Sequence, residues 1–161
     1  MSNIKQVIVI RKDLKVRRGK ECAQASHGAM AFLTRRLQKQ YDAENPKIAY
    51  VEKIDPVTGK IIKVVDAFAS GKSRPCFVKN LFTPIEWEWI QGSFAKVCCQ
   101  VNSEEELMQI YDQAKAAGLE VHLIEDRGLT EFHGVKTATC LAIGPDLSEK
   151  IDVITGNLEL Y

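Results

Sequence analysis

The chain opens with a short β-branched apolar run and follows it with a long stretch of helical periodicity. Residues 6–10 read QVIVI, and a continuous run of this kind is typical of a central strand that is covered on both faces. The helical stretch is expected from about Lys20 to about Gln40, returning across the sheet to which the strand belongs. A strand followed by an amphipathic helix indicates an α/β fold.

One face of this helix carries three polar side chains. On a period of about 3.6 residues, Lys20, Gln24 and His27 lie at i, i+4 and i+7 and therefore share a face. We expect the opposite face to pack on the sheet, so that the outer face presents an ammonium, an amide and an imidazole. An ordinary solvated helix would give the same pattern, so the three residues are informative only as a set. The apolar face is expected to contain Cys22, Ala25, Ala29, Phe32 and Leu33.

The second half of the chain contains clear signals for further elements. Thr83, followed by Pro84 and Glu86, is a typical helix start, and Gly92 ends that helix. Together the elements predict a three-layer α/β sandwich, a four-stranded mixed sheet with helices on both faces. Strands are expected at 6–10, 95–101, 121–125 and 137–143, with Gly144-Pro145 ending the last. A helix is expected between Ser103 and Ala117, and a final helix, capped by Asp146 or Ser148, reaches about Thr155.

Residues 41–81 stand apart from this alternation. Two alternating segments between Ile48 and Phe68 flank the turn sequence at 55–59, which predicts a β-hairpin. Residues 69–75 (ASGKSRP) read as a basic loop. We therefore expect a single domain over residues 1–161, with an inserted hairpin-like segment at about 41–81.

The net charge of +1 hides a strong asymmetry along the chain. Residues 1–39 carry ten Lys and Arg against two acidic residues, whereas residues 81–161 carry five against fourteen. Basic side chains clustered beside Lys20 are typical of a protein that binds a phosphate-rich partner, while the near-neutral total argues against indiscriminate binding to nucleic acid. The alternative is that the acidic half packs against the basic half and neutralises it.

The sequence lacks the signals of a membrane or secreted protein. No apolar run approaches the roughly 20 residues of a membrane helix, and the apolar stretch near the start is too short for a secretory signal. We therefore expect a cytoplasmic protein without a membrane segment. The five cysteines are odd in number and lack C-x-x-C spacing, so buried free thiols are expected rather than disulfides or a zinc site.

Two polar segments are expected to meet at one edge of the sheet. Residues 17–20 follow the first strand, and Asp126 follows the third. In α/β sheets, functional sites gather at the carboxyl ends of the strands. The sequence therefore predicts that Lys20 and Asp126 come together at this edge.

Several motifs, taken in order, resemble those of the type-2 (archaeal and eukaryotic) peptidyl-tRNA hydrolases, and together they cover most of the chain. They comprise VIRKDLK at 9–15, Gly19-Lys20, AQASHG at 23–28, the segment from Lys96 to Leu107, AAGL at 116–119, DRGLT at 126–130, TCLAIGP at 139–145, Ile151-Asp152 and TGNL at 155–158.

This resemblance implies hydrolysis of the ester that joins a peptide to the 3′-terminal ribose of tRNA, with peptidyl-tRNA as partner and with neither a cofactor nor a metal. Lys20, at the first turn of its helix, would stabilise negative charge together with the helix amides. Asp126 would hold Lys20 or orient a water, and His27 and Gln24 would position the water or the tRNA end. The sequence does not indicate which group accepts the proton of the attacking water. The catalytic candidates are Lys20, Asp126, Thr130, Thr139 and His27, and the substrate-binding candidates are Gln24, Arg17, Arg18, Gly128 and Glu131.

Three of these residues also have a purely structural explanation. Taken alone, Asp126 is equally typical of a turn, Thr139 of a strand with a satisfied hydroxyl, and Lys20 of a solvated helix surface. The chain also departs from the family pattern: Glu131 stands where Gln is common, Gly28 where Ala is frequent, and residues 40–80 have no counterpart. The insertion bears on substrate preference more than on chemistry, whereas Glu131 and the insertion together leave a loss of turnover open.

Two other function classes therefore stay open. One is an RNA-binding module that has lost turnover, and the other is a protein-interaction scaffold that uses Trp87, Trp89 and the insertion. Because the two tryptophans diverge on a helix, one is expected in the core and the other over the insertion or at the contact of a homodimer.

Overall fold

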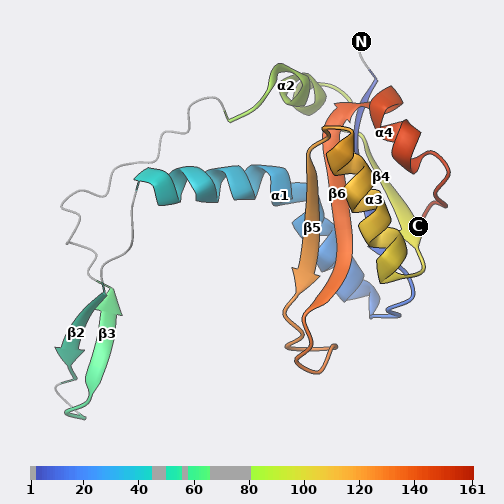
Figure 1. Ribbon diagram of the computed structural model, residues 1–161. Helices are drawn as coiled ribbons and strands as arrows, with labels where there is room; N and C mark the ends of the chain where they lie inside the picture. The colour runs from blue at the N-terminus through green and yellow to red at the C-terminus, as the bar shows by residue number, and fades with distance from the viewer. Residues whose placement is uncertain (1–2, 45–49, 56–57, 66–80) are drawn as a thin grey trace. The chain divides into compact units, whose positions relative to one another are not determined.

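The computed structural model describes residues 3–44, 50–55, 58–65 and 81–161 (Figure 1). The chain divides into two compact units, one formed by residues 1–34 with 82–161 and the other by residues 35–81. Each unit is described by itself.

The first unit is built on a four-stranded mixed sheet, as predicted. Its strands are β1 (Ile4–Arg11), β4 (Lys96–Val101), β5 (Val121–Asp126) and β6 (Thr137–Leu147), in the order β4-β1-β6-β5. β1 is parallel to β4, and β6 is antiparallel to both β1 and β5. The carboxyl ends of β1, β4 and β5 therefore lie at the same edge, together with the start of β6.

Helices cover both faces of this sheet. They are α1 (Arg18–Glu44), α2 (Pro84–Gln91), α3 (Glu104–Ala116) and α4 (Ser148–Thr155). Val7 and Val9 of β1 belong to the core cluster that contains α3 and α4 residues, whereas Ile8 and Ile10 point to the other face, where the first half of α1 packs. In Figure 1, α3 and α4 lie in front of the sheet and the start of α1 lies behind it. The predicted three-layer sandwich is confirmed.

The helix-start signals of α2 and α3 are also confirmed. Thr83 and Glu86 form a capping box at the start of α2, and Ser103 caps α3 through the amide of Glu106.

Trp89 is a core residue, 2% exposed, whereas Trp87 is 49% exposed. None of the described helices combines the length and the apolar character that crossing a membrane requires.

Strand β6 runs further than predicted. It continues through Gly144-Pro145 to Leu147, and residues 146 and 147 still pair with β1 across a bulge. Gly144 has φ +81°, and a bulge is one of the few places where a strand accepts proline. Neither Asp146 nor Ser148 caps α4, because Leu147 occupies the cap position, without a side-chain hydrogen bond, and the Asp146 carboxylate accepts from the Leu147 amide instead.

The second unit contains a two-stranded antiparallel sheet of β2 (Tyr50–Ile54) and β3 (Ile61–Val65). Residues 56 and 57 of the expected turn, and the expected basic loop at 69–75, lie outside the described residues. That this segment is an inserted hairpin within a single domain stays a prediction.

The face of α1 that packs on the sheet differs from the prediction. Gln24, Gly28 and Ala31 are buried, whereas Cys22 is exposed. The buried face thus runs through Lys20 and Gln24, which were expected on the outer face. Hydrophobic periodicity missed this because a polar side chain can be buried once it has hydrogen-bond partners, and periodicity does not reveal partners. The remaining residues of the predicted apolar face do pack against the core: Ala25, Ala29, Phe32 and Leu33.

Gly28 provides a test of this helix packing. A Cβ at position 28 would lie 3.5 Å from the Ala142 Cβ and 3.8 Å from the Cys140 Sγ, which are ordinary van der Waals distances. We expect Gly28→Ala to raise the free energy of unfolding by about 0.5–1 kcal/mol, because alanine has the higher helix propensity and restricts the unfolded chain. Urea denaturation measures this change.

Two variants serve as controls for Gly28→Ala. Gly28→Leu should destabilise by about 1–3 kcal/mol, since it overfills the interface with the sheet. Ala23→Gly, on the exposed side of α1, should cost about 1 kcal/mol from propensity alone. A loss of stability in Gly28→Ala would show that α1 packs more closely on the sheet than described.

Candidate active site

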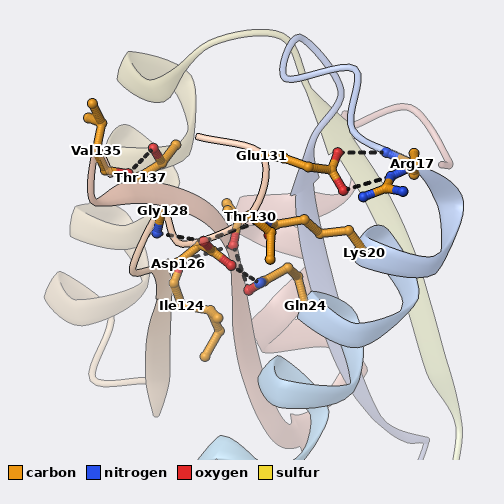
Figure 2. A network of polar contacts seen from close by, with 11 residues as sticks. Arg17, Lys20, Gln24, Ile124, Asp126, Gly128, Thr130, Glu131, Val135 and Thr137 are labelled. Carbon is orange, nitrogen blue, oxygen red and sulfur yellow. Dashed lines mark hydrogen bonds and ion pairs between the residues drawn. The ribbon is translucent and has the colours of Figure 1, made fainter. Parts of the chain in front are cut away.

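Polar side chains from three elements converge at the sheet edge where β5 ends and α1 begins (Figure 2). Asp126 is the last residue of β5, and Thr139 lies near the start of β6. Lys20 and Gln24 lie in the first two turns of α1, and Figure 2 shows both side chains pointing toward Asp126. The predicted meeting of Lys20 and Asp126 is confirmed.

The Lys20 ammonium is held by two oxygen atoms. Its Nζ donates to the Thr130 Oγ1 at 2.8 Å and lies 3.2 Å from the Asp126 Oδ1. The Lys20 and Asp126 side chains are only 10% and 17% exposed. Solvent screening between the two charges is therefore weaker than in a surface ion pair.

Gln24 links Asp126 to β6. Its Nε2 donates to the Asp126 Oδ2 at 2.7 Å, and its Oε1 lies 3.0 Å from the Thr139 hydroxyl. That hydroxyl also lies 3.2 Å from the carbonyl oxygen of Ile124, so its single proton can be given to either acceptor. The carboxylate on one side and the hydroxyl on the other fix the orientation of the Gln24 amide.

The Asp126 carboxylate is surrounded by donors. Burial alone would raise the pKa of Asp126, but hydrogen bonds from the Gly128 amide at 2.7 Å, from Lys20 and from Gln24 outweigh it and lower this pKa below its ordinary value. Asp126 is therefore ionised at neutral pH and is a weak general base there. The arrangement suits it to hold Lys20 and Gln24 in place.

Gly128 allows the tight loop that brings its amide to Asp126. Its φ is +82°, and a Cβ at this position would lie 2.5 Å from the carbonyl oxygen of Val135. The Gly128 carbonyl in turn accepts from the Gly134 amide at 2.8 Å. Any side chain at position 128 would therefore open the loop that follows β5.

Glu131 ties this loop to the start of α1. Its carboxylate accepts from the Arg17 backbone amide at 3.2 Å and from the Arg17 Nε at 3.1 Å. The backbone hydrogen bond is the main cause that lowers the pKa of Glu131, and the guanidinium adds to it. The Arg17 side chain itself is 83% exposed.

A small pocket lies beside Lys20. Its volume is about 10 Å³, close to the least space that holds one water molecule. Phe132 forms one wall, with its ring centroid 4.3 Å from the Lys20 Nζ. Phe132 was not predicted from the sequence, because an aromatic residue shortly after the DRGLT motif does not by itself indicate contact with Lys20. The other lining residues are Ile10, Arg11, Leu14, Val16, Glu21, Gln24 and Thr139.

Two predicted site residues do not join this network. His27 and Arg18 are exposed, and the hydrogen bonds and ion pairs that connect the network within the described residues do not include them. His27 lies about 60° back from Gln24 on the helix, away from the buried face. Catalytic and substrate-binding roles for these two residues stay predictions.

Cys140, which borders the network, does not contribute a thiolate to it. Cys22, Cys98, Cys99 and Cys140 are free thiols, and Cys76 lies outside the described residues. Burial raises the pKa of Cys140 to about 12. Within the part of the chain that the structure describes, no three His, Cys, Asp or Glu side chains gather closely enough to hold a metal ion.

The lowered pKa of Asp126 predicts a pH-dependent stability. Such a carboxylate stabilises the folded protein at pH values above the pKa that it has in the unfolded chain, near 3.8. This stabilisation is lost as the pH falls through the lower pKa that it has in the folded protein. The difference in unfolding free energy between the wild type and Asp126→Asn should therefore be constant from about pH 5 to pH 8 and shrink below about pH 4. Urea denaturation across this range measures it. Asp112→Asn, an exposed carboxylate change on α3, is the control, and a difference that grows toward acid would contradict the prediction.

Comparison with known proteins identifies the family. A sequence model described as Peptidyl-tRNA hydrolase PTH2 matches residues 4–161. The peptidyl-tRNA hydrolase of Methanothermobacter thermautotrophicus is 35% identical over 157 residues, which is 98% of this chain and 99% of the relative. Those of Methanopyrus kandleri and Methanocaldococcus jannaschii are each 32% identical, covering 97% and 98% of this chain and 97% and 99% of the relatives. The chain therefore belongs to the peptidyl-tRNA hydrolase PTH2 family.

Proposed function

We propose that this protein hydrolyses the ester bond of peptidyl-tRNA and releases a peptide and free tRNA. The observation that carries the proposal is the Lys20 ammonium, which is held by Asp126 and Thr130 at 3.2 and 2.8 Å where α1 begins. The names of the curated relatives and the family match support the same reaction.

Ester hydrolysis needs stabilisation of the negative charge that develops on the carbonyl oxygen. A fixed ammonium next to the amides at a helix start supplies this stabilisation, and it costs little reorganisation when the donors are already in place. In this proposal Lys20 provides the charge, while Asp126 and Thr130 keep its ammonium in position. Gln24 and Thr139 in turn keep Asp126 oriented.

The small pocket suggests how the substrate approaches. At about 10 Å³ it is too small for an amino-acid side chain, but it approaches the space that one water needs. Because the walls of this pocket are mainly apolar, we place the attacking water outside it, on the side from which the ester approaches. The ester then approaches from the exposed side of Thr130.

The exposed basic residues beside the site support a role in tRNA binding. Lys12, Lys15, Arg17 and Arg18 lie between the end of β1 and the first turn of α1, and all four are exposed. Phosphate contacts supply most of the sequence-independent affinity for nucleic acid. In this proposal Arg17 and Arg18 contact the tRNA backbone, and Glu131 holds Arg17.

Three further features belong to the same proposal. The protein acts in the cytoplasm, where translation supplies peptidyl-tRNA. It folds as a single domain over residues 1–161 with an insertion at about 41–81. It forms a homodimer, and the exposed Trp87 is the tryptophan for which the sequence left open either a dimer contact or a position over the insertion.

The proposal is tested with purified full-length protein and an N-acetyl-aminoacyl-tRNA. Each protein molecule should release many equivalents of tRNA, with or without a chelator. Asp126→Asn should lower kcat by about 100-fold, because a displaced Lys20 ammonium no longer meets the developing charge. The matched control Asp112→Asn should react at the wild-type rate.

A second variant separates loss of chemistry from loss of fold. Thr130→Val removes the other oxygen that holds Lys20, and because Thr130 itself is exposed, the protein should stay folded at the assay temperature with only a small fall in melting temperature. Its kcat should fall by about tenfold or more. Stoichiometric binding of tRNA without release by the wild type would contradict the proposed function.

Arg18 gives a separate prediction about affinity. Arg18→Ala should raise KM for the tRNA ester with little change in kcat, because Arg18 lies outside the network around Lys20. The slope of log affinity against log salt should fall in magnitude by about 0.9, as for the loss of one phosphate contact. Lys115→Ala, an exposed cation on α3, is the control. An unchanged salt slope in Arg18→Ala would remove Arg18 from the tRNA interface.

A further inference from the structure

The Lys20 ammonium has a third neighbour besides its two oxygen partners. An ammonium carries three N–H donors, and two of them are directed to Thr130 and Asp126. The ring centroid of Phe132 lies 4.3 Å from the same Nζ, within the range of a cation–π interaction. Because the Lys20 side chain is only 10% exposed, this contact is largely shielded from water.

The loop that carries Phe132 is fixed at several points. The Val135 amide donates to the Phe132 carbonyl oxygen at 2.8 Å, which closes a turn directly after the ring. Glu131, the preceding residue, is bonded to Arg17 at the start of α1. The ring is thus held on the same loop as Thr130, and the loop is anchored to the helix that carries Lys20.

An aromatic ring acts differently from an oxygen atom when it lies next to an ammonium. A carboxylate or hydroxyl oxygen in this place would compete with a substrate oxygen for the third N–H, whereas a ring face attracts the cation without a strong acceptor atom. The ring also forms a wall of the small pocket and so limits the access of water to Lys20.

We propose that Phe132 is a positioning residue for Lys20. Its ring holds the ammonium against Asp126 and Thr130 and limits the access of water to the third N–H, which stays available for the developing oxyanion of the ester. The inference rests on the proposed function for the identity of the oxyanion. The contact between ring and ammonium does not depend on that function.

The first test measures the contact itself. In protein labelled with ¹³C-lysine, the ring current of Phe132 should shift the Lys20 ε-CH₂ signal upfield, and the signal is assigned through its loss in Lys20→Arg. Phe132→Tyr should keep the upfield shift, and Phe132→Leu should abolish it. A wild-type Lys20 signal at the ordinary lysine position would overturn the inference, whether or not the protein hydrolyses peptidyl-tRNA.

The second test measures the effect on turnover. Phe132→Leu keeps an apolar side chain of similar size but removes the ring face, and we expect kcat to fall by about tenfold with KM little changed. Phe132→Tyr should stay within about twofold of the wild type. A purely structural role would be served equally by leucine, so equal kcat values for the wild type and Phe132→Leu would overturn the proposal. If Phe132→Leu lowers the melting temperature, Phe132→Met replaces it in the comparison.

The chain offers a matched control for both measurements. Lys96 lies over the ring of Phe94, with 3.1 Å between its Nζ and the ring centroid, in a part of the first unit that does not contribute to the network around Lys20. Phe94→Leu therefore removes a lysine–phenylalanine contact of the same kind. It should leave both the Lys20 signal and kcat unchanged, and an equal loss of kcat in Phe94→Leu would contradict a specific role for Phe132.

Discussion

The ion pair between Lys20 and Asp126 is the contact on which the rest of the site depends. Both side chains lose most of their water, and such a pair is tolerated only when the remaining donors and acceptors are also satisfied. Thr130, Gln24 and the Gly128 amide supply these partners. The pair therefore contributes more to the position of its groups than to the net stability of the fold, because the cost of desolvation offsets much of the attraction.

The topology of the sheet explains why residues so far apart in sequence form this pair. β1 and β5 both run toward the same edge, although β6 lies between them. The chain leaves β1, turns and enters α1 with Lys20 in its first turn, and the last residue of β5 is Asp126. A parallel relation between two strands thus brings a helix start next to a strand end.

The sequence predicted the features that depend on local signals. The apolar run at residues 6–10 predicted the buried strand β1, and the capping-box pattern that begins at Thr83 predicted the start of α2. The meeting of Lys20 with Asp126 followed from the strand-end rule. The face of α1 that packs on the sheet could not be predicted from local signals. Gln24 is buried there only because Asp126 and Thr139, which are distant in sequence, form hydrogen bonds with it. Phe132 also escaped prediction, because its meaning depends on a loop that brings its ring to Lys20.

The structure also decides between the two readings of the charge asymmetry. Several basic residues of the first segment do pair with acidic residues of the second half, as the neutralising alternative requires: Arg11 with Glu104, Lys5 with Asp152, Arg17 with Glu131 and Lys20 with Asp126. Packing thus offsets part of the basic charge. Lys15 and Arg18 are nevertheless exposed within a few residues of Lys20. The cationic surface beside the site is therefore smaller than the sequence total implies, and its position, rather than its size, is what favours a phosphate-bearing substrate.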